Sequence, residues 1–342
     1  MVKTLLIRVD CNPVIASGHL MRCLSIAHKA KEKGIESIFL MSDNSSENVV
    51  VKNDFTLLNL HSDWRDLSSE IPKIQNLIHQ YDSPVLLIDT YSIDRDYTEV
   101  LFGKVPLIYL GSKTDNLGKL DMIVNYSSCI DHEFYKNKFP GTRLLLGVEF
   151  APLRKEFQNL PLAEASEVND VIITTGNTDH PHFITSFLKK AERFITEKKL
   201  RCHVVVGRLF NNKEELERMA ERNGLINLHY GVTEMSSLMR TCQLAVTANG
   251  TTVYELAACG VPAISFAISE EQLASGESLG NQGIVKYCGL YSSPASPALE
   301  KVLYHFESMI NDHSERRKLV SRAKSFIDGN GCEYIVQEIL KL

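Results

Sequence analysis

The sequence predicts an α/β protein that is built from two doubly wound domains. Short apolar runs alternate with amphipathic stretches in both halves of the chain. These runs are almost continuously apolar, which is typical of strands buried on both faces of a parallel sheet. The length of 342 residues also exceeds what a single core usually organises. We therefore expect two Rossmann-like domains that face each other across a cleft.

The first half begins this alternation. Its predicted strands are short and rich in branched residues, at 4–9, 37–41, 85–89, 107–110 and 122–125. A helix is predicted after the first strand, because Leu20, Leu24 and Ala27 recur at the spacing of one helical face.

The second half repeats the pattern, with strands predicted at 171–175, 203–207, 244–248 and 263–267. Helices are predicted at 181–198, 212–223 and 252–259, followed by a helical region from about 296 to 340. Between the halves, residues 151–168 contain two prolines and no strand pattern. We expect a linker there, between a first domain at 1–150 and a second domain at 169–342. One large mixed sheet is the alternative.

Composition and net charge argue against several classes of protein. The net charge of -5 gives no electrostatic case for nucleic-acid binding. No apolar run reaches the roughly 18 residues of a transmembrane helix, and the opening MVKTLLIRVD does not resemble a secretory signal. We expect a cytoplasmic protein. The eight cysteines form no C-x-x-C pair, so we expect reduced, buried thiols.

The first candidate site is the long loop before the first helix. Ligands of such sheets bind beyond the carboxyl ends of strands, and this loop contains Gly18 and His19. The start of a helix favours anions and disfavours a protonated imidazole, so His19 is a candidate base. Asp10 could orient the imidazole or hold the loop. Alternatively, Ser17 caps the helix and His19 is a bystander.

The second and third candidates also follow strands. Asp89 ends the strand at 85–89 and Tyr91 comes two residues later, although Asp89 could instead cap the next helix. The stretch Gly176-Asn177-Thr178 could bind phosphate through N–H and hydroxyl donors, or form a capped turn. It matches no P-loop pattern. The neighbouring His180 and His182 have H-x-H spacing without an evident third ligand, so no metal is predicted.

The fourth candidate follows the strand at 244–248. Asn249 and Gly250 precede a predicted helix that contains Glu255. The loop can present N–H donors to a diphosphate, and Glu255 can accept hydrogen bonds from a ribose diol. The alternative is a capping box, with Thr251 or Thr252 as the cap and Glu255 as its partner.

These motifs together resemble a known family. The pattern D-x(7)-G-H-x-x-R, from Asp10 to Arg22, resembles the N-terminal motif of the pseudaminic-acid pathway hydrolases, which act on UDP-2,4-diacetamido-2,4,6-trideoxy sugars. The same order continues with D-x-Y at 89–91, PLRKEF at 152–157, G-x-T-D at 176–179 and NGTTVYELAACGVP at 249–262. The resemblance covers most of residues 1–290. It implies a GT-B-type fold, similar to the peptidoglycan N-acetylglucosaminyltransferase.

The resemblance also implies an activity. A UDP-sugar would be hydrolysed to free sugar and UDP by water attack at the anomeric carbon, with inversion and without a cofactor or metal. His19 would position or deprotonate the water, Tyr91 would lie near the sugar, and Glu255 would bind the ribose. The candidate catalytic residues are His19, Asp10 and Tyr91. The candidate substrate-binding residues are Gly18, Arg22, Asp89, Gly176, Asn177, Thr178, Asn249, Gly250, Thr251, Thr252 and Glu255.

Two other functions stay open. A GT-B glycosyltransferase would use the same donor with a hydroxyl acceptor, but residues 45–80 show no basic amphipathic helix for a lipid-linked acceptor. A non-catalytic nucleotide-sugar binding protein is the third possibility. Thr90 stands where the family often has histidine, and Gly111-Ser112 replaces an expected Asp-Asp pair. These departures leave the exact sugar and the nucleobase open.

Overall fold

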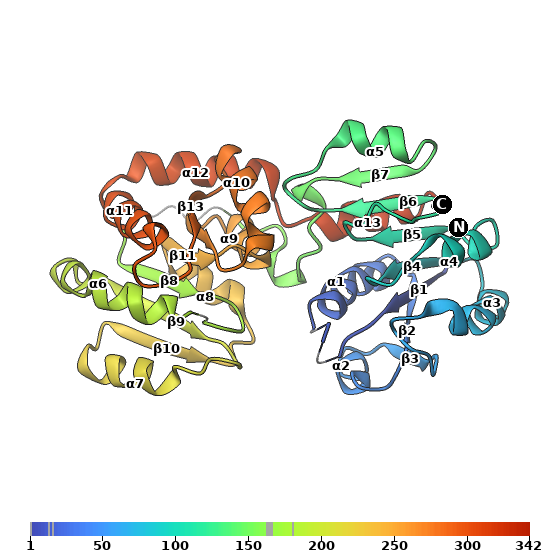
Figure 1. The fold of residues 1–342 in the computed structure, drawn as a ribbon, viewed down its shortest axis with the longest axis horizontal. Coiled ribbons are helices and arrows are strands. Elements are labelled where there is room, and N and C mark those ends of the chain that lie inside the picture. Colours follow the sequence, from blue (N-terminus) through green and yellow to red (C-terminus); the bar gives the residue numbers. More distant parts are fainter. Residues whose placement is uncertain (1, 13, 16, 162–166, 180) are drawn as a thin grey trace. The chain divides into compact units, whose positions relative to one another are not determined.

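A computed structural model describes the whole chain except residues 1, 13, 16, 162–166 and 180. It divides into two compact units, Met1–Lys155 with Asn330–Leu342, and Glu156–Gly329. Each unit has its own sheet with helices packed against it (Figure 1). The predicted α/β class with two doubly wound domains is confirmed, and the alternative of one mixed sheet is wrong.

The first unit contains a seven-stranded parallel sheet in the order β3-β2-β1-β4-β5-β6-β7. The strands are β1 (Thr4–Val9), β2 (Glu36–Met41), β3 (Thr56–Asn59), β4 (Pro84–Asp89), β5 (Leu107–Leu110), β6 (Met122–Asn125) and β7 (Arg143–Leu146). The strand order reverses between β1 and β4. In doubly wound sheets this switch point is where ligand-binding loops diverge.

Helices cover both faces of this sheet, and several begin at a capping side chain. Asp94 accepts from the backbone N–H of Tyr97 at 2.9 Å at the start of α4, and Asp131 accepts from that of Phe134 at 3.0 Å at the start of α5. The helices are α1 (Gly18–Glu32), α2 (Glu47–Lys52), α3 (Ile71–Gln80), α4 (Arg95–Leu101), α5 (His132–Lys138) and α13 (Gly331–Ile339), with 3₁₀ turns η1 (Leu67–Glu70) and η2 (Val148–Phe150). The chain passes from the first unit to the second within the 3₁₀ turn η3 (Lys155–Phe157).

The C-terminal helix corrects the predicted domain boundary. Residues 330–342 were assigned to the second domain, but they belong to the first unit. Ile335, Val336 and Ile339 of α13 are fully buried in the same core as Leu24 and Ala27 of α1. An amphipathic pattern shows that a helix has an apolar face, but it does not show which sheet buries that face. The chain leaves the first unit after Lys155, inside the predicted linker, whose residues 162–166 lie outside the described residues.

The second unit contains a six-stranded parallel sheet in the order β10-β9-β8-β11-β12-β13. Its strands are β8 (Asp170–Thr174), β9 (Arg201–Val206), β10 (Ile226–Tyr230), β11 (Leu244–Ala248), β12 (Ala263–Ala267) and β13 (Lys286–Leu290). Its helices are α6 (Phe183–Lys198), α7 (Lys213–Arg222), α8 (Met235–Thr241), α9 (Thr251–Cys259), α10 (Leu273–Asn281), α11 (Pro297–Asn311) and α12 (His313–Phe326), with the 3₁₀ turn η4 (Glu270–Gln272).

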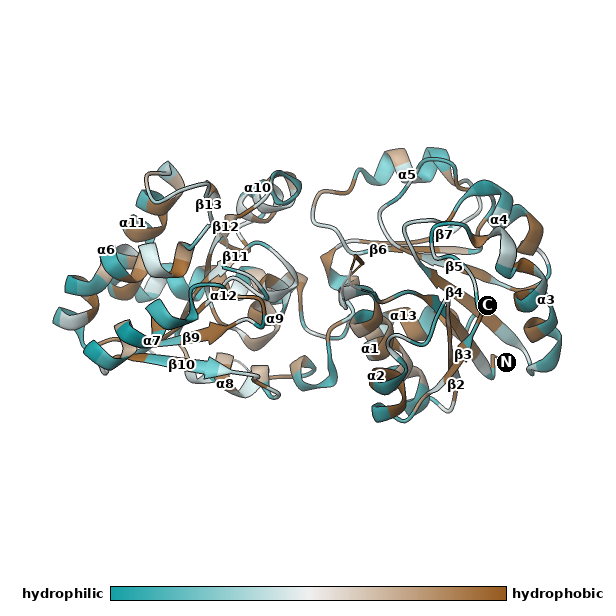
Figure 2. Ribbon diagram, turned by 60° about the horizontal axis from the view of Figure 1, so that its bottom comes forward, coloured by the Kyte–Doolittle hydropathy of each residue, from teal (hydrophilic) through white to brown (hydrophobic). Residues whose placement is uncertain are grey.

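Aromatic packing anchors the core of this unit. Phe183, at the start of α6, stacks on Phe266 of β12 with ring centroids 3.7 Å apart, and Tyr291 meets the ring of Phe183 edge-on at 5.0 Å. Figure 2 shows that apolar residues are concentrated in the strands of the sheets, and that helices such as α5 and α7 carry polar stretches.

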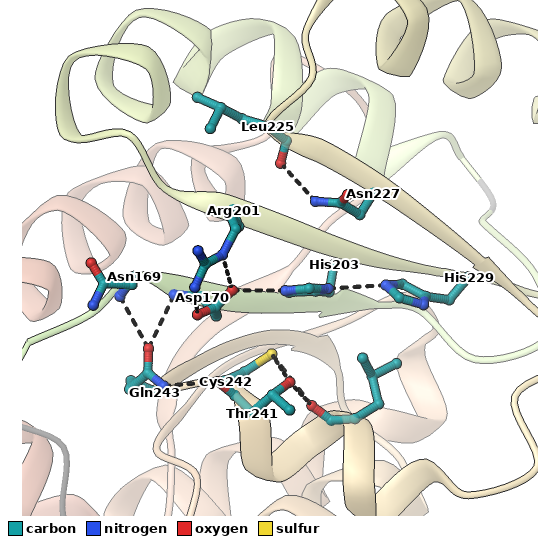
Figure 3. A network of polar contacts seen from close by, with 11 residues as sticks. Asn169, Asp170, Arg201, His203, Leu225, Asn227, His229, Thr241, Cys242 and Gln243 are labelled. Carbon is teal, nitrogen blue, oxygen red and sulfur yellow. Dashed lines mark hydrogen bonds and ion pairs between the residues drawn. The ribbon is translucent and has the colours of Figure 1, made fainter.

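A polar network ties together the strands at one side of this sheet (Figure 3). Asp170 accepts from Arg201 Nε at 2.6 Å and lies 2.9 Å from His203 Nε2, and His203 Nδ1 lies 3.0 Å from His229 Nε2. Hydrogen bonds from Arg201 and His203 outweigh partial burial and lower the pKa of Asp170. Asp170 and Arg201 are the first residues of β8 and β9. This network therefore stabilises the amino-terminal ends of these strands, whereas the candidate binding loops follow the carboxyl ends.

Every predicted strand is present within two residues of its predicted limits. The four strands that the sequence did not predict are β3, β7, β10 and β13. These are the two outermost strands of each sheet.

Candidate functional site

The switch point of the first sheet brings His19 and Asp89 together. His19 lies in the first turn of α1, directly after Gly18, and Asp89 is the last residue of β4. His19 Nδ1 lies 2.5 Å from Asp89 Oδ1, and both side chains are buried. Ser17 occupies the N-cap position without a side-chain cap hydrogen bond, so the alternative in which Ser17 caps this helix is wrong.

Arg22 completes this pair from one turn further along α1. Its Nε donates to Asp89 Oδ2 at 2.6 Å, its Nη2 donates to Asp89 Oδ1, and its Nη1 donates to Tyr126 Oη at 2.9 Å. Burial opposes the ionisation of Asp89, but Arg22 and His19 outweigh it and hold the pKa of this carboxyl below its ordinary value. Arg22, which we expected among the substrate-binding residues, thus has three of its donors engaged within the protein.

Tyr91 flanks His19 on the open side of this cluster. The two rings meet edge-to-face with centroids 4.6 Å apart. Tyr91 is 65% exposed, unlike the buried His19 and Asp89. The geometry therefore leaves the Tyr91 ring accessible to a ligand that also reaches His19.

Asp10 does not contact His19, contrary to one of our two expectations. Its carboxylate lies 2.7 Å from Arg8 Nη1 and accepts from Ser42 Oγ at 2.8 Å. Ser42 directly follows β2, so Asp10 holds the loops after β1 and β2 together. The carboxylate that orients the imidazole is Asp89. Asp89 does not cap the next helix, because Asp94 does so.

The second unit places two predicted loops at the carboxyl ends of neighbouring strands. Gly176 and Asn177 follow β8, which pairs in parallel with β11. Gly176 has a φ of +85°, a conformation that glycine adopts without strain. A Cβ added at Gly207 would lie 2.4 Å from the carbonyl oxygen of Gly176, so the loop after β9 supports this turn closely. Thr178 is half-buried. His180, with its H-x-H spacing, lies outside the described residues.

The loop after β11 leads into α9. Asn249 is buried, and its side chain donates to the carbonyl of Gln272 at 3.1 Å. The N-cap of α9 is Gly250, without a side-chain cap hydrogen bond, so Thr251 and Thr252 lie inside the helix. The alternative of a capping box is therefore wrong. Glu255 is half-buried in the second turn.

Sequence reasoning missed Tyr126. It directly follows β6 and accepts a hydrogen bond from Arg22, and the signal that identified Asp89 applies to it as well, namely a polar side chain at the end of a predicted strand. All eight cysteines are free, and six are buried, whereas Cys11 is half-buried and Cys129 is exposed. Among the described residues, no group of His, Cys, Asp and Glu could hold a metal ion, and no helix has the length and apolarity to span a bilayer.

Comparison with known proteins supports the resemblance. No family model matches the sequence. The uncharacterized protein MJ1062 of Methanocaldococcus jannaschii is 23% identical over 269 residues, which cover 75% of this chain and 54% of that protein. The Helicobacter pylori pseudaminic acid cytidylyltransferase and UDP-2,4-diacetamido-2,4,6-trideoxy-beta-L-altropyranose hydrolase is 22% identical over 347 residues, which cover 97% of this chain and 55% of that protein. The chain thus spans about half the length of the curated relatives it matches. The expected similarity to this hydrolase is confirmed.

Solved structures show the fold. MurG of Acinetobacter baumannii matches with a TM-score of 0.65 at 14% identity, over 99% of this chain and 100% of that chain. The pneumococcal O-GlcNAc transferase GtfA, solved with UDP and GlcNAc, matches with a TM-score of 0.62 at 10% identity, over 99% of each chain. The chain therefore has the fold of GT-B glycosyltransferases, as the resemblance implied.

Proposed function

We propose that this protein hydrolyses a UDP-linked diacetamido-trideoxyhexose to the free sugar and UDP, with water attacking the anomeric carbon and inverting it. Two findings support the substrate class. The motifs run in the same order as in the hydrolase family, and the similarity to the Helicobacter pylori protein extends over 97% of the chain. That protein's name includes two activities, of which the motifs favour the hydrolase.

The observation that carries the reaction type is the pairing of His19 with Asp89. A nitrogen and a carboxylate oxygen 2.5 Å apart require a proton between them, and the ionised Asp89 assigns this proton to Nδ1. In neutral imidazole the lone pair then lies on Nε2. Among the described residues, the hydrogen-bond partners of the ring all contact Nδ1, so Nε2 remains for water. This is the arrangement of a general base oriented by a carboxylate.

The chemical step balances with these groups alone. The water oxygen forms a bond to the anomeric carbon while Nε2 of His19 accepts a water proton. The bond between the anomeric carbon and the diphosphate oxygen breaks, and UDP leaves with the electron pair. The N–H groups of the loops at 176–178 and 249–252 would stabilise the leaving charge, and Glu255 would accept hydrogen bonds from the ribose. Tyr91 would contact the sugar.

Turnover in H₂¹⁸O without any acceptor tests the proposal. We expect UDP release, with the released UDP free of ¹⁸O, because the water oxygen enters the sugar. Proton NMR of the first-formed anomer should show inversion. Label in the UDP would mean attack at phosphorus and would refute the proposed mechanism.

A glycosyltransferase is the second candidate, because solved structures with this fold include transferases such as GtfA. It would use the same donor, with His19 deprotonating an acceptor hydroxyl in place of water. UDP release that depends on an added hydroxyl acceptor would favour this alternative over hydrolysis.

A further inference from the structure

We propose that Arg22 and Tyr126 are positioning residues for His19. Arg22, held in place by Tyr126, balances the negative charge of the ionised Asp89, and this keeps His19 in its neutral, basic form. Their part in catalysis rests on the proposed function. Their effect on the charge of His19 does not, and it can be measured without any substrate.

Two opposite charges, those of Asp89 and Arg22, lie beside the His19 ring. Asp89 Oδ1 lies 2.5 Å from Nδ1 and, alone, would stabilise an imidazolium as an ion pair. Arg22 Nη2 lies 3.1 Å from the same Nδ1, and a fixed cation at this distance disfavours a second positive charge. The outcome depends on how completely Arg22 occupies the carboxylate.

Arg22 occupies the carboxylate side-on. Nε donates to Oδ2 and Nη2 donates to Oδ1, so one guanidinium engages both oxygens. The Asp89 side chain is completely buried and that of Arg22 is 19% exposed, so water screens this pair only weakly. The carboxylate charge is thus already balanced, and Asp89 can orient His19 by a hydrogen bond without drawing a proton onto the ring.

Tyr126 fixes the guanidinium in this position. Its hydroxyl accepts from Nη1 at 2.9 Å, and Arg22 Cζ lies 5.7 Å from the centre of its ring. Besides His19 and Tyr126, the described ionisable side chains that act on Asp89 and Arg22 are Cys23 and Tyr109, and burial raises the pKa of Tyr109 to about 12, so neither carries a charge that could replace Arg22. Cys23 Sγ donates to Asp89 Oδ2 at 3.4 Å, burial raises the pKa of this thiol, and Tyr91 contributes only its ring edge.

The test is an NMR titration of His19 in the ligand-free, full-length protein. The chain has eleven histidines, so the His19 signal is assigned by its loss in His19→Ala. We compare wild type with Arg22→Gln, which removes the charge, and with Tyr126→Phe, which removes only the hydroxyl. Arg65→Gln is the matched control, because Arg65 is an exposed arginine of the same unit that pairs with Asp63.

In Arg22→Gln, the pH at which half of His19 is protonated should rise, since Asp89 then attracts a proton without competition. Tyr126→Phe should raise it by less, in the same direction, and Arg65→Gln should leave it unchanged. The acidic limb of kcat/KM should move to higher pH in parallel, with KM near the wild-type value.

An unchanged or lowered titration midpoint of His19 in both Arg22→Gln and Tyr126→Phe would overturn the proposal. If Arg22→Gln does not fold, the titration of Tyr126→Phe alone decides the test. A raised KM with an unchanged midpoint would make Arg22 a substrate contact. If the midpoint rises but no UDP-sugar is hydrolysed, the electrostatic role stands and the proposed function fails.

Discussion

Replacing Asp89 with asparagine removes a buried charge on which both His19 and Arg22 depend. The side chain of Asp89 is completely inaccessible, so solvent weakens its interactions little. Arg22 donates two charge-assisted hydrogen bonds to it, at about 1.5 to 3 kcal/mol each. The resulting 3 to 6 kcal/mol agrees with the roughly 3 to 5 kcal/mol lost when one partner of a buried ion pair is removed. We expect Asp89→Asn to lose stability in this range.

Activity should fall further than stability alone explains. An amide can donate to His19 Nδ1, which would move the ring proton to Nε2 and remove the base, as in serine-protease triads, where the aspartate-to-asparagine change costs about 10⁴-fold in kcat. We expect a loss of about 10² to 10⁴-fold in UDP release.

The unfolding of the first unit, which contains Asp89, can be followed separately, because Trp64 is the only tryptophan of the sequence and lies in that unit. Its fluorescence during urea unfolding measures the loss. The folded pKa of Asp89 lies below its ordinary value of 3.8, so the stabilisation is fully present above that value and is lost as pH falls through the folded pKa. The difference between wild type and Asp89→Asn should therefore shrink as the pH falls below about 4. A variant with wild-type activity, or with a constant difference at acidic pH, would refute this reasoning.

Two further predictions address the second unit and the domain boundary. Gly207→Ala would place a methyl group 2.4 Å from the carbonyl oxygen of Gly176, so the loop after β8 must shift. The affinity for UDP, measured by calorimetry, should then fall about tenfold or more. The control Gly224→Ala has no neighbouring atom within 4 Å and should bind UDP normally. Ile335→Ala should destabilise the first unit by about 2 to 5 kcal/mol in the Trp64 signal, because Ile335 is fully buried there. Unchanged Trp64 unfolding would place α13 outside the first unit.

The sequence predicted central strands well and outer strands poorly, for a physical reason. Strands such as β1 and β11 are buried along their whole length, so apolarity alone reveals them. Outer strands have one neighbour and partial exposure, so their sequences mix polar and apolar residues, as INLHY does in β10 and KYCGL in β13. Such segments are recognised through their pairing partner, which a local pattern does not contain.

The candidate site follows the same logic. The rule that ligand-binding groups follow strands identified His19, Asp89 and Tyr91, which the structure brings together. It did not distinguish Asp10 from Asp89 as the partner of His19. Both follow apolar strands, and their contacts depend on strand order, since β1 lies between β2 and β4. Asp10 contacts the loop after β2, and Asp89 contacts α1.

The central claim is that His19 activates water, and one comparison tests it most directly. UDP release from the UDP-linked diacetamido-trideoxyhexose is measured without an acceptor for wild type and His19→Ala, while calorimetry measures UDP binding by each. We predict release by wild type, a loss of at least about 100-fold in His19→Ala, and equal affinity for UDP. Equal rates in the two proteins, or a wild type that releases UDP only when a hydroxyl acceptor is added, would contradict it.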